Sequence, residues 1–228
     1  MTSLRWHTCG MSTGQDSTPS PSIFRHPLAH LPQLALAGQG HPLPPPDDAA
    51  CQALWQKYEM LPNVQRHSRL VAHIATRLAL CAYERGHAVD VPAVRASALL
   101  HDIAKTYCVQ HGGSHALLGG AWMVHETGNY DLARGILLHV HWPWAVPEGA
   151  AICSLPFFVI YADKRVRHDT CVTLEERYED LQQRYGFTES ARAGVRAAYE
   201  QGKTIERALS AQLGWALHED SFDSGRLV

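Results

Sequence analysis

Apolar residues recur at intervals of three and four along most of the chain, which is the period of one face of an α-helix. The clearest stripe consists of Val64, Val71, Ile74, Leu78 and Cys81. No stretch alternates apolar and polar residues in the manner of a half-buried strand, and the sequence contains no internal repeat. The pattern therefore predicts an all-α fold, a bundle of helices packed around one core.

Capping and breaking residues divide this pattern into separate helices. Asp90, Ser114 and Thr173 are expected to cap helices, the last through a capping box with Glu176. Glycines are expected to end several of them, as Gly128 does. The predicted helices cover about residues 50–60, 63–84, 90–106, 114–127, 131–141, 148–167 and 173–186, and two more begin near residues 188 and 204.

Residues 1–48 differ from the rest of the chain in composition. They hold eight of the 13 prolines, including the run Pro44-Pro45-Pro46. Such a segment cannot form a helix and has little apolar surface to bury, so we expect a flexible tail. The helical domain is then predicted to occupy residues 49–228.

Composition and charge exclude several classes of partner. The formal net charge of the 228 residues is -2, and without a broad basic field we expect no nucleic-acid partner. No apolar run approaches the roughly 20 residues that span a bilayer, so no membrane association is expected. The six cysteines are scattered without a C-x-x-C pair, which predicts reduced thiols and a cytoplasmic protein.

Polar residues occur at several positions where the helices should be apolar. Histidine is unusually frequent, with 15 copies, and His67 falls within the apolar stripe described above. His101 and Asp102 end another apolar helix, and Asp163 follows the apolar run at residues 157–162. Burying such groups is costly unless they are paired, hydrogen-bonded or bound to a metal. Two imidazoles and two carboxylates converging on one core predict a site for a divalent metal ion.

These four residues match, in order, the H…HD…D signature of the HD superfamily of metal-dependent phosphohydrolases. The segment ALLHDIAK, Ala98–Lys105, resembles the central motif of that superfamily in its HDIG form, with alanine in place of glycine. The residues around His67 and Asp163 resemble its first and last motifs, and the resemblance covers about residues 60–185. It implies a helical bundle that hydrolyses a phosphate ester or anhydride, with a small phosphate compound such as a nucleotide as substrate.

Some branches of this superfamily bind two metals, through two further histidines between the HD pair and the last aspartate. His115 and His139 stand in that order in this chain, with His141 as an alternative to His139. The complete set is similar to the bimetallic branch that includes the bacterial diadenosine tetraphosphate hydrolases. The resemblance implies one or two divalent ions, of Mn, Fe, Co, Ni, Zn or Mg, with Asp102 bridging the two.

The implied reaction suggests roles for charged residues near these ligands. Asp102, its metals and a bridging water would supply hydroxide at neutral pH. Lys105 lies one helical turn beyond the HD pair, where it would either contact a substrate phosphate or form a salt bridge. Arg165 and Arg167 follow the last ligand and are further candidates for a phosphate contact, against a solvated surface role. Arg177, in a helix rich in glutamate, is expected to form a surface ion pair.

Departures from the patterns of individual branches leave the substrate open. The chain lacks the Gly-Tyr-Pro motif of cyclic-di-GMP phosphodiesterases, and it has Asp163-Lys-Arg-Val-Arg167 where the dinucleotide hydrolases often carry Glu-Pro. The leading hypothesis is hydrolysis of a nucleotide or dinucleotide. The alternatives are a phosphodiesterase acting on cyclic nucleotides or RNA ends, a metal- or nucleotide-binding module without turnover, and a helical interaction protein whose match to the signature is chance. The sequence does not specify the native metal or the oligomeric state.

Overall fold

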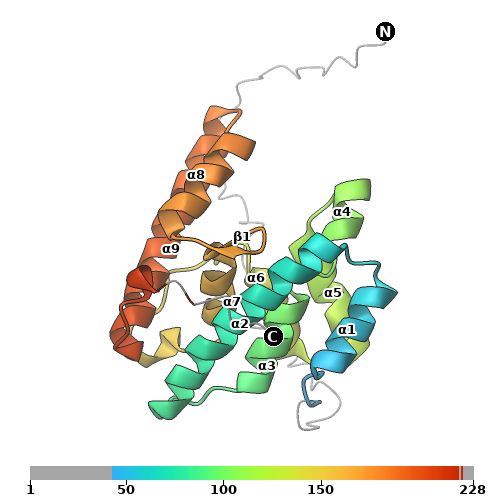
Figure 1. Ribbon diagram of the computed structural model, residues 1–228, viewed down its shortest axis with the longest axis horizontal. Coiled ribbons are helices and arrows are strands. Elements are labelled where there is room, and N and C mark those ends of the chain that lie inside the picture. Colours follow the sequence, from blue (N-terminus) through green and yellow to red (C-terminus); the bar gives the residue numbers. More distant parts are fainter. Residues whose placement is uncertain (1–42, 221, 223–228) are drawn as a thin grey trace, which may run out of the picture. The chain divides into compact units, whose positions relative to one another are not determined.

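A computed structural model describes residues 43–220 and 222, and most of this part of the chain is helical (Figure 1). The helices are α1 (Asp48–Lys57), α2 (Pro62–Glu84), α3 (Val91–Leu100), α4 (Lys105–His111), α5 (His115–Thr127), α6 (Tyr130–Leu138), α7 (Leu155–Lys164), α8 (Leu174–Tyr185) and α9 (Glu189–Leu213), with short 3-10 turns η2 (Gly149–Ile152) and η3 (Leu217–Glu219). Two short strands, β1 (Val166–Arg167) and β2 (Thr170–Cys171), form an antiparallel hairpin after α7. The predicted all-α fold class is confirmed. Most of the predicted tail, residues 1–42, lies outside the described residues.

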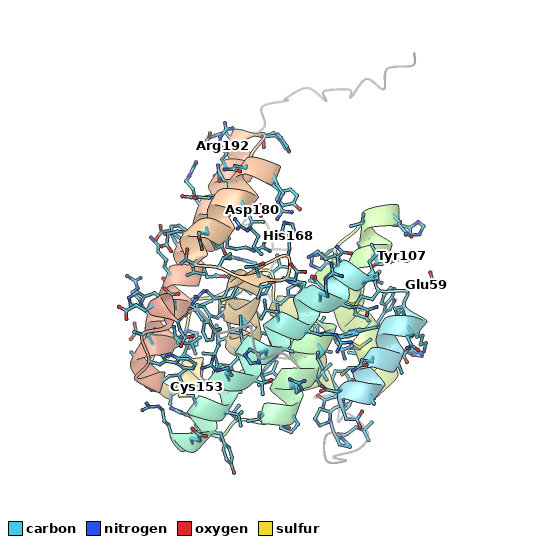
Figure 2. All side chains as sticks on the ribbon, viewed as in Figure 1. Glu59, Tyr107, Cys153, His168, Asp180 and Arg192 are labelled. Carbon is cyan, nitrogen blue, oxygen red and sulfur yellow. The ribbon has the colours of Figure 1, made fainter. Side chains whose placement is uncertain are left out.

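The core is built around α2, α3, α6 and α7, which pack against one another near the centre of Figure 1. The predicted stripe of α2 is almost wholly buried, and every residue of α7 from Pro156 to Ala162 is buried as well. The indole of Trp55 on α1 donates a hydrogen bond of 2.9 Å to the carbonyl of Leu99 on α3, which ties α1 to this core. Figure 2 shows the side chains that fill the bundle, with Cys153 shortly before α7 and His168 in the turn of the β-hairpin that follows it. Within the described residues, no helix combines the length and apolar content needed to cross a bilayer.

The predicted capping residues perform that role in the structure. Asp90 accepts a hydrogen bond of 2.9 Å from the backbone N–H of Ala93, and Ser114 accepts one from Leu117. Thr173 and Glu176 form the reciprocal capping box. These contacts satisfy backbone N–H groups that a helix leaves unpaired at its start. Three helix starts were therefore correctly predicted from local chemistry alone.

Several predicted boundaries are wrong, and the break after α3 matters most for the site. The helix expected to reach residue 106 ends at Leu100, and a turn at residues 101–104 separates it from α4. Hydrogen bonds from the N–H of Ile103 to the carbonyl of Leu100, and from the N–H of Lys105 to that of Asp102, close this turn. No glycine or proline marks the break, so the sequence pattern did not reveal it. The HD pair consequently lies in a turn between two helices.

Three other boundaries also differ from the prediction. The segment 148–167 is not one helix, because η2 and α7 are separate and the chain then enters the β-hairpin. The helix expected to begin at Thr204 does not exist as a separate element, because α9 continues through it and the Thr204 hydroxyl bonds back to the carbonyl of Glu200. Asn63 is not an N-cap, since α2 already begins at Pro62, whose fixed backbone angle suits a first helical turn.

Gly135 on α6 allows three core helices to approach closely. A Cβ atom at this position would lie 2.2 Å from Cδ2 of Leu155 on α7 and 2.4 Å from the hydroxyl of Ser97 on α3. Only glycine fits such a contact without displacing its neighbours. This close packing fixes the end of α6, where His139 follows as the C-cap residue.

Candidate metal centre

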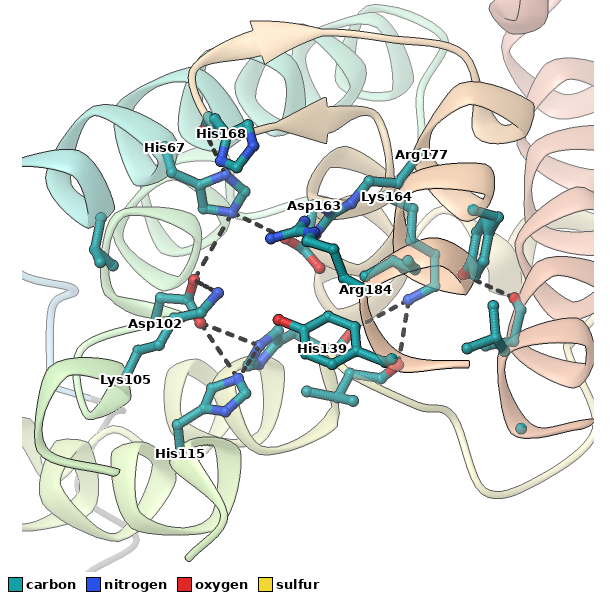
Figure 3. Close-up of a pocket in the computed structure, with 18 of the residues that line it drawn as sticks. His67, Asp102, Lys105, His115, His139, Asp163, Lys164, His168, Arg177 and Arg184 are labelled. Atoms are coloured by element: carbon teal, nitrogen blue, oxygen red, sulfur yellow. Dashed lines mark hydrogen bonds and ion pairs between the residues drawn. The ribbon is translucent and has the colours of Figure 1, made fainter. Parts of the chain in front are cut away.

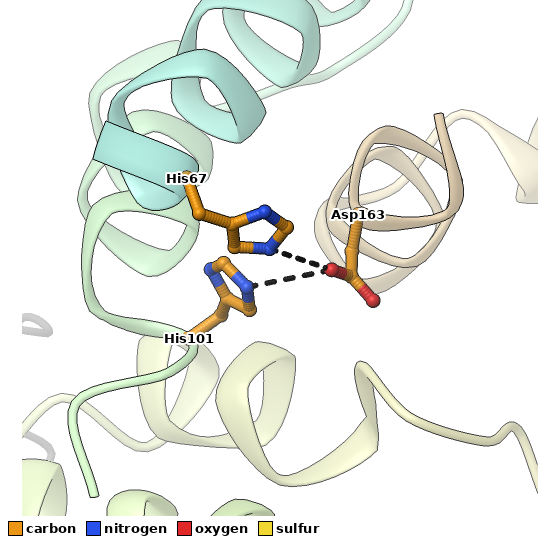
Figure 4. Close-up of side chains that lie close together, drawn as sticks. All are labelled: His67, His101 and Asp163. Carbon is orange, nitrogen blue, oxygen red and sulfur yellow. Dashed lines mark hydrogen bonds and ion pairs between the residues drawn. The ribbon is translucent and has the colours of Figure 1, made fainter. Parts of the chain in front are cut away.

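Six polar side chains from five segments of the chain meet at one place in the bundle; Figure 3 shows five of them, and Figure 4 shows the sixth, His101. They come from the buried face of α2, the turn after α3, the start of α5, the end of α6 and the last turn of α7. In chain order they are His67, His101, Asp102, His115, His139 and Asp163. All six residues predicted as metal ligands are therefore brought together. His141, the alternative to His139, is exposed to solvent, whereas His139 is buried.

One half of this cluster gathers around Asp163 (Figure 4). Its Oδ1 atom lies 3.0 Å from Nε2 of His67 and 3.6 Å from Nε2 of His101. The Oδ2 atom of Asp102 faces the same two imidazoles, at 3.8 Å from His67 and 3.4 Å from His101. Two ring nitrogens and two carboxylate oxygens thus surround a common point.

The other half gathers around the second oxygen of Asp102. Its Oδ1 atom lies 3.3 Å from Nε2 of His115 and 3.7 Å from Nε2 of His139. The Nε2 atoms of these two histidines are 3.2 Å apart. The two oxygens of the Asp102 carboxylate therefore face different pairs of histidines, which is the arrangement that a bridging ligand requires.

Hydrogen bonds to backbone carbonyls fix three of the imidazole rings. The Nδ1 atom of His67 lies 2.9 Å from the carbonyl of His168, and those of His101 and His139 lie 2.7 Å and 2.6 Å from carbonyls three residues earlier in the chain. Because a carbonyl only accepts, each Nδ1 carries a proton and donates it. In the neutral form of each ring, the lone pair is then on Nε2, the atom that points into the cluster. Such outer hydrogen bonds are typical of histidines that bind metals.

Unpaired atoms at the centre of the cluster indicate that a cation fits there. In the part of the chain that the structure describes, Nε2 of His101 and Oδ1 of Asp102 are buried without a hydrogen-bond partner. Leaving such atoms unsatisfied costs about 1–3 kcal/mol each. A divalent ion would satisfy both, and nitrogen with carboxylate oxygen suits hard to borderline ions. These buried histidine and aspartate groups could therefore hold a metal ion.

The electrostatics of the cluster keep its carboxylates ionised. Burial favours the neutral acid, yet the positive charges of His101 and Lys105 hold the pKa of the Asp102 carboxyl well below its usual range. For His101 itself, burial again opposes the charged form, but Asp102 and Asp163 raise its pKa to about 10. Burial lowers the pKa of His139 to about 3, so this imidazole is neutral at pH 7. Without an ion, the cluster balances its two carboxylates with protonated side chains.

The three basic residues expected to contact phosphate have different positions. Lys105 begins α4, and its Nζ atom lies 2.7 Å from Oδ2 of Asp102, so the salt bridge anticipated as one of its two roles is present. Arg167 lies on β1 and is not among the residues that line the cavity beside the cluster. Its expected phosphate contact has no support from the cavity geometry.

For Arg165 the expectation of a substrate contact is wrong. Its side chain is only 2% exposed, and its guanidinium donates hydrogen bonds of 2.6–2.7 Å to the carbonyls of Val172, Leu217 and Asp220 and to the hydroxyl of Tyr161. Closeness in the sequence to the candidate ligand Asp163 therefore does not bring the Arg165 side chain into the site. This side chain instead fastens the chain after α9 to α7 and the β-hairpin.

A cavity of about 580 Å³ opens beside the cluster, and three of the lysine and arginine residues that line it, Lys164, Arg177 and Arg184, were not predicted to do so. Lys164 is buried and donates long hydrogen bonds of 3.4 Å and 3.3 Å to the carbonyls of His139 and Val140, linking α7 to the turn that carries a candidate ligand. Arg177 on α8 forms the expected ion pair, at 3.7 Å from Asp180, but its side chain is only 12% exposed and lines the cavity. Its position next to the apolar residues Tyr178 and Leu181 was the available signal.

The helical fold and the histidine–aspartate cluster are compatible with an HD-type domain. Comparisons with known proteins neither support nor exclude this relation. No protein-family model matches the chain, and neither the curated proteins nor the solved structures contain a match to it.

Proposed function

We propose that this protein is a metal-dependent phosphohydrolase of the HD type, which hydrolyses a phosphate ester or anhydride of a nucleotide or dinucleotide. One observation carries the proposal: the two oxygens of the buried Asp102 carboxylate face two separate pairs of histidines. A carboxylate with a purely structural role needs only hydrogen-bond donors around it. Around Asp102, four imidazole Nε2 atoms point into the cluster, and such atoms are typical ligands of metal ions.

The cluster divides into two candidate metal positions. His67, His101, Asp163 and one oxygen of Asp102 would hold the first ion, and His115, His139 and the other oxygen of Asp102 would hold the second. When bound, divalent ions at such positions lower the pKa of water that attacks phosphorus and neutralise charge on the phosphoryl oxygens. Of the two positions, the second is the more open, since the side chain of His115 is 28% exposed.

The protein's own groups would orient and neutralise the substrate. Lys105 is 39% exposed while it contacts Asp102, so its ammonium group can turn from the carboxylate to a phosphoryl oxygen in the cavity. Burial by itself lowers the pKa of the Lys105 ammonium group, but the carboxylates of Asp102 and Asp163 outweigh this effect and raise the pKa, which keeps the group positive at neutral pH. The carbonyl contacts of His67, His101 and His139 hold the rings in place, so little reorganisation accompanies the reaction.

The decisive experiment combines metal content with turnover. The protein is purified without added metal, and its metals are measured by elemental analysis. It is then assayed with p-nitrophenyl phosphate, bis-p-nitrophenyl phosphate and a nucleotide panel, with Mn, Fe, Co, Ni, Zn or Mg present. We expect about two metals per chain and metal-dependent phosphate release. A content of about one metal per chain would support the first metal position only. Absence of both metal and turnover would refute the proposal and favour an interaction protein.

A further inference from the structure

The cavity beside the cluster is larger than one phosphoryl group requires. Its volume of about 580 Å³ lies within the range of pockets that enclose whole small molecules. One wall is a single face of α8, formed by Arg177, Tyr178, Leu181, Arg184 and Tyr185. At a rise of 1.5 Å per residue, this face extends roughly 12 Å away from the cluster. The cavity therefore has space for a phosphate with a sizeable organic group.

The inner end of this wall presents a partly buried positive charge. The Arg177 side chain is only 12% exposed and points towards Asp163 from the side opposite the histidines (Figure 3). Among the described residues, its one ion pair is a 3.7 Å contact with Asp180, which also makes a much closer contact with Arg184. Lys105 and Lys164 line the same cavity as Arg177. An anion between these three cations would relieve their repulsion.

The middle of the cavity is apolar and open. Leu181 on α8 and Val195 on α9 line it together with the small residues Ala191, Gly194 and Ala198 of α9. A Cβ atom added at Gly194 would meet no atom within 4 Å, so this part of the helix faces unfilled space. A flat organic group can lie against such a surface, with its phosphate directed towards the inner, charged end.

We propose that the α8–α9 wall is the part of the site that selects the substrate, an inference that rests on the function proposed above. Arg177 binds the oxygens of the phosphoryl group held at the cluster. The organic group of the same phosphate compound occupies the apolar space beside Gly194. The wall then distinguishes compounds with a large group from phosphate compounds with a small one.

Filling the space beside Gly194 tests the position of the organic group. Each variant is assayed with two matched pairs of substrates, p-nitrophenyl phosphate against methyl phosphate and adenosine diphosphate against inorganic pyrophosphate. Gly194→Leu should raise KM roughly ten-fold or more for the large member of each hydrolysed pair, and leave the small member within about two-fold. Ala197→Leu adds the same side chain on the exposed face of α9 and should change neither. Equal effects on large and small substrates, or no effect, would overturn this assignment.

The role of Arg177 is tested by comparing its substitution with the substitution of its ion-pair partner, Asp180. Arg177→Gln should lower kcat/KM roughly 10- to 100-fold for large and small substrates alike, with metal content unchanged, because a charge-assisted contact to phosphate is lost. Asp180→Asn removes the same ion pair but keeps the arginine, and should stay within about two-fold of the wild type. Equal losses of kcat/KM in the two variants would show that Arg177 has a structural role and does not bind the phosphoryl group. If the metal-loaded wild type hydrolyses none of the substrates, the proposed function fails; if it is active without these patterns, only the α8–α9 assignment fails.

Discussion

The two sides of the cavity are built in opposite ways. The cluster side consists of buried groups on packed helices, with His101 and His139 at 0% and 2% exposure and each ring held by a backbone carbonyl. The α8–α9 side has few buried residues at its outer end, and its charges pair with one another at the surface. A reacting centre needs fixed geometry, whereas a wall that receives variable groups can tolerate looser packing. Changes on the two sides should therefore have different consequences.

The largest expected effect follows from loss of the shared carboxylate. Asp102→Ala should abolish both metal binding and measurable hydrolysis, because both candidate metal positions use this side chain. His101→Ala should do the same through the first position. Elemental analysis and phosphate release test both variants, and His141→Ala, an exposed neighbour of the cluster, is the control that should behave as the wild type. Full activity in either ligand variant would exclude the proposed site.

Removal of the metal from the cluster side should lower the stability of the folded protein. A ligand that binds only the folded state at 100 times its dissociation constant stabilises that state by about 2.7 kcal/mol. We expect the melting temperature to fall on chelation and to recover when the metal is restored. In Asp102→Ala, chelation should leave the melting temperature unchanged. An unchanged wild-type melting temperature would show that the cluster is stable without an ion.

Substitution of glycine by alanine should change the free energy of unfolding in opposite directions on the two sides of the cavity. At Gly135 a methyl group would clash with Leu155 and Ser97, so Gly135→Ala should lower the free energy of unfolding by about 1–2 kcal/mol. At Gly194 the methyl group meets open space within a helix, so Gly194→Ala should raise it by about 0.5–1 kcal/mol. Urea unfolding of both variants measures the difference. Equal shifts would contradict the contrast in packing.

The smallest effect is expected for the ion pairs of the α8–α9 side. Arg184 and Asp180 form an i,i+4 pair on α8, and the arginine side chain is 39% exposed. Pairs of this kind contribute about 0.3–0.5 kcal/mol, and salt screens them. Arg184→Gln should therefore change the free energy of unfolding by no more than about that amount, and by less in 1 M salt. A loss above roughly 1 kcal/mol would show that this side is more tightly integrated than its exposure indicates.

The contrast between the two sides also explains which residues the sequence could identify. His67 was recognisable because a polar residue interrupts an apolar stripe, and such an interruption needs a partner. The order of the remaining histidines and aspartates then indicated the rest of the cluster. Periodicity also predicted most helices, but not the turn at residues 101–104 that separates α3 from α4, because local backbone hydrogen bonds close this turn and no glycine or proline marks it.

The sequence predicts the roles of charged residues outside the H…HD…D signature much less well. Arg165 and Arg177 both stand in polar surroundings in the sequence, yet the first is buried and structural, whereas the second lines the cavity and also forms the expected ion pair. A helix such as α8 has a polar face whether it meets solvent or a cavity. The apolar neighbours Tyr178 and Leu181 are the local signal for a cavity, and the packing of α9 against α8 decides between the two environments.

The continuity of α9 has a consequence for the motions of the cavity wall. None of residues 189–201 of this helix is buried, whereas Ile205, Leu209 and Leu213 are fully buried in the core. Amide hydrogens should therefore exchange quickly near Ala191 and slowly near Leu209, with protection rising along a single unbroken helix. The wall is thus formed by the less buried end of a helix that packs against α8 at this end and is anchored in the core at its other end. The cavity would widen by fraying of this end, and a bound molecule that contacts Ala191 would slow exchange there first.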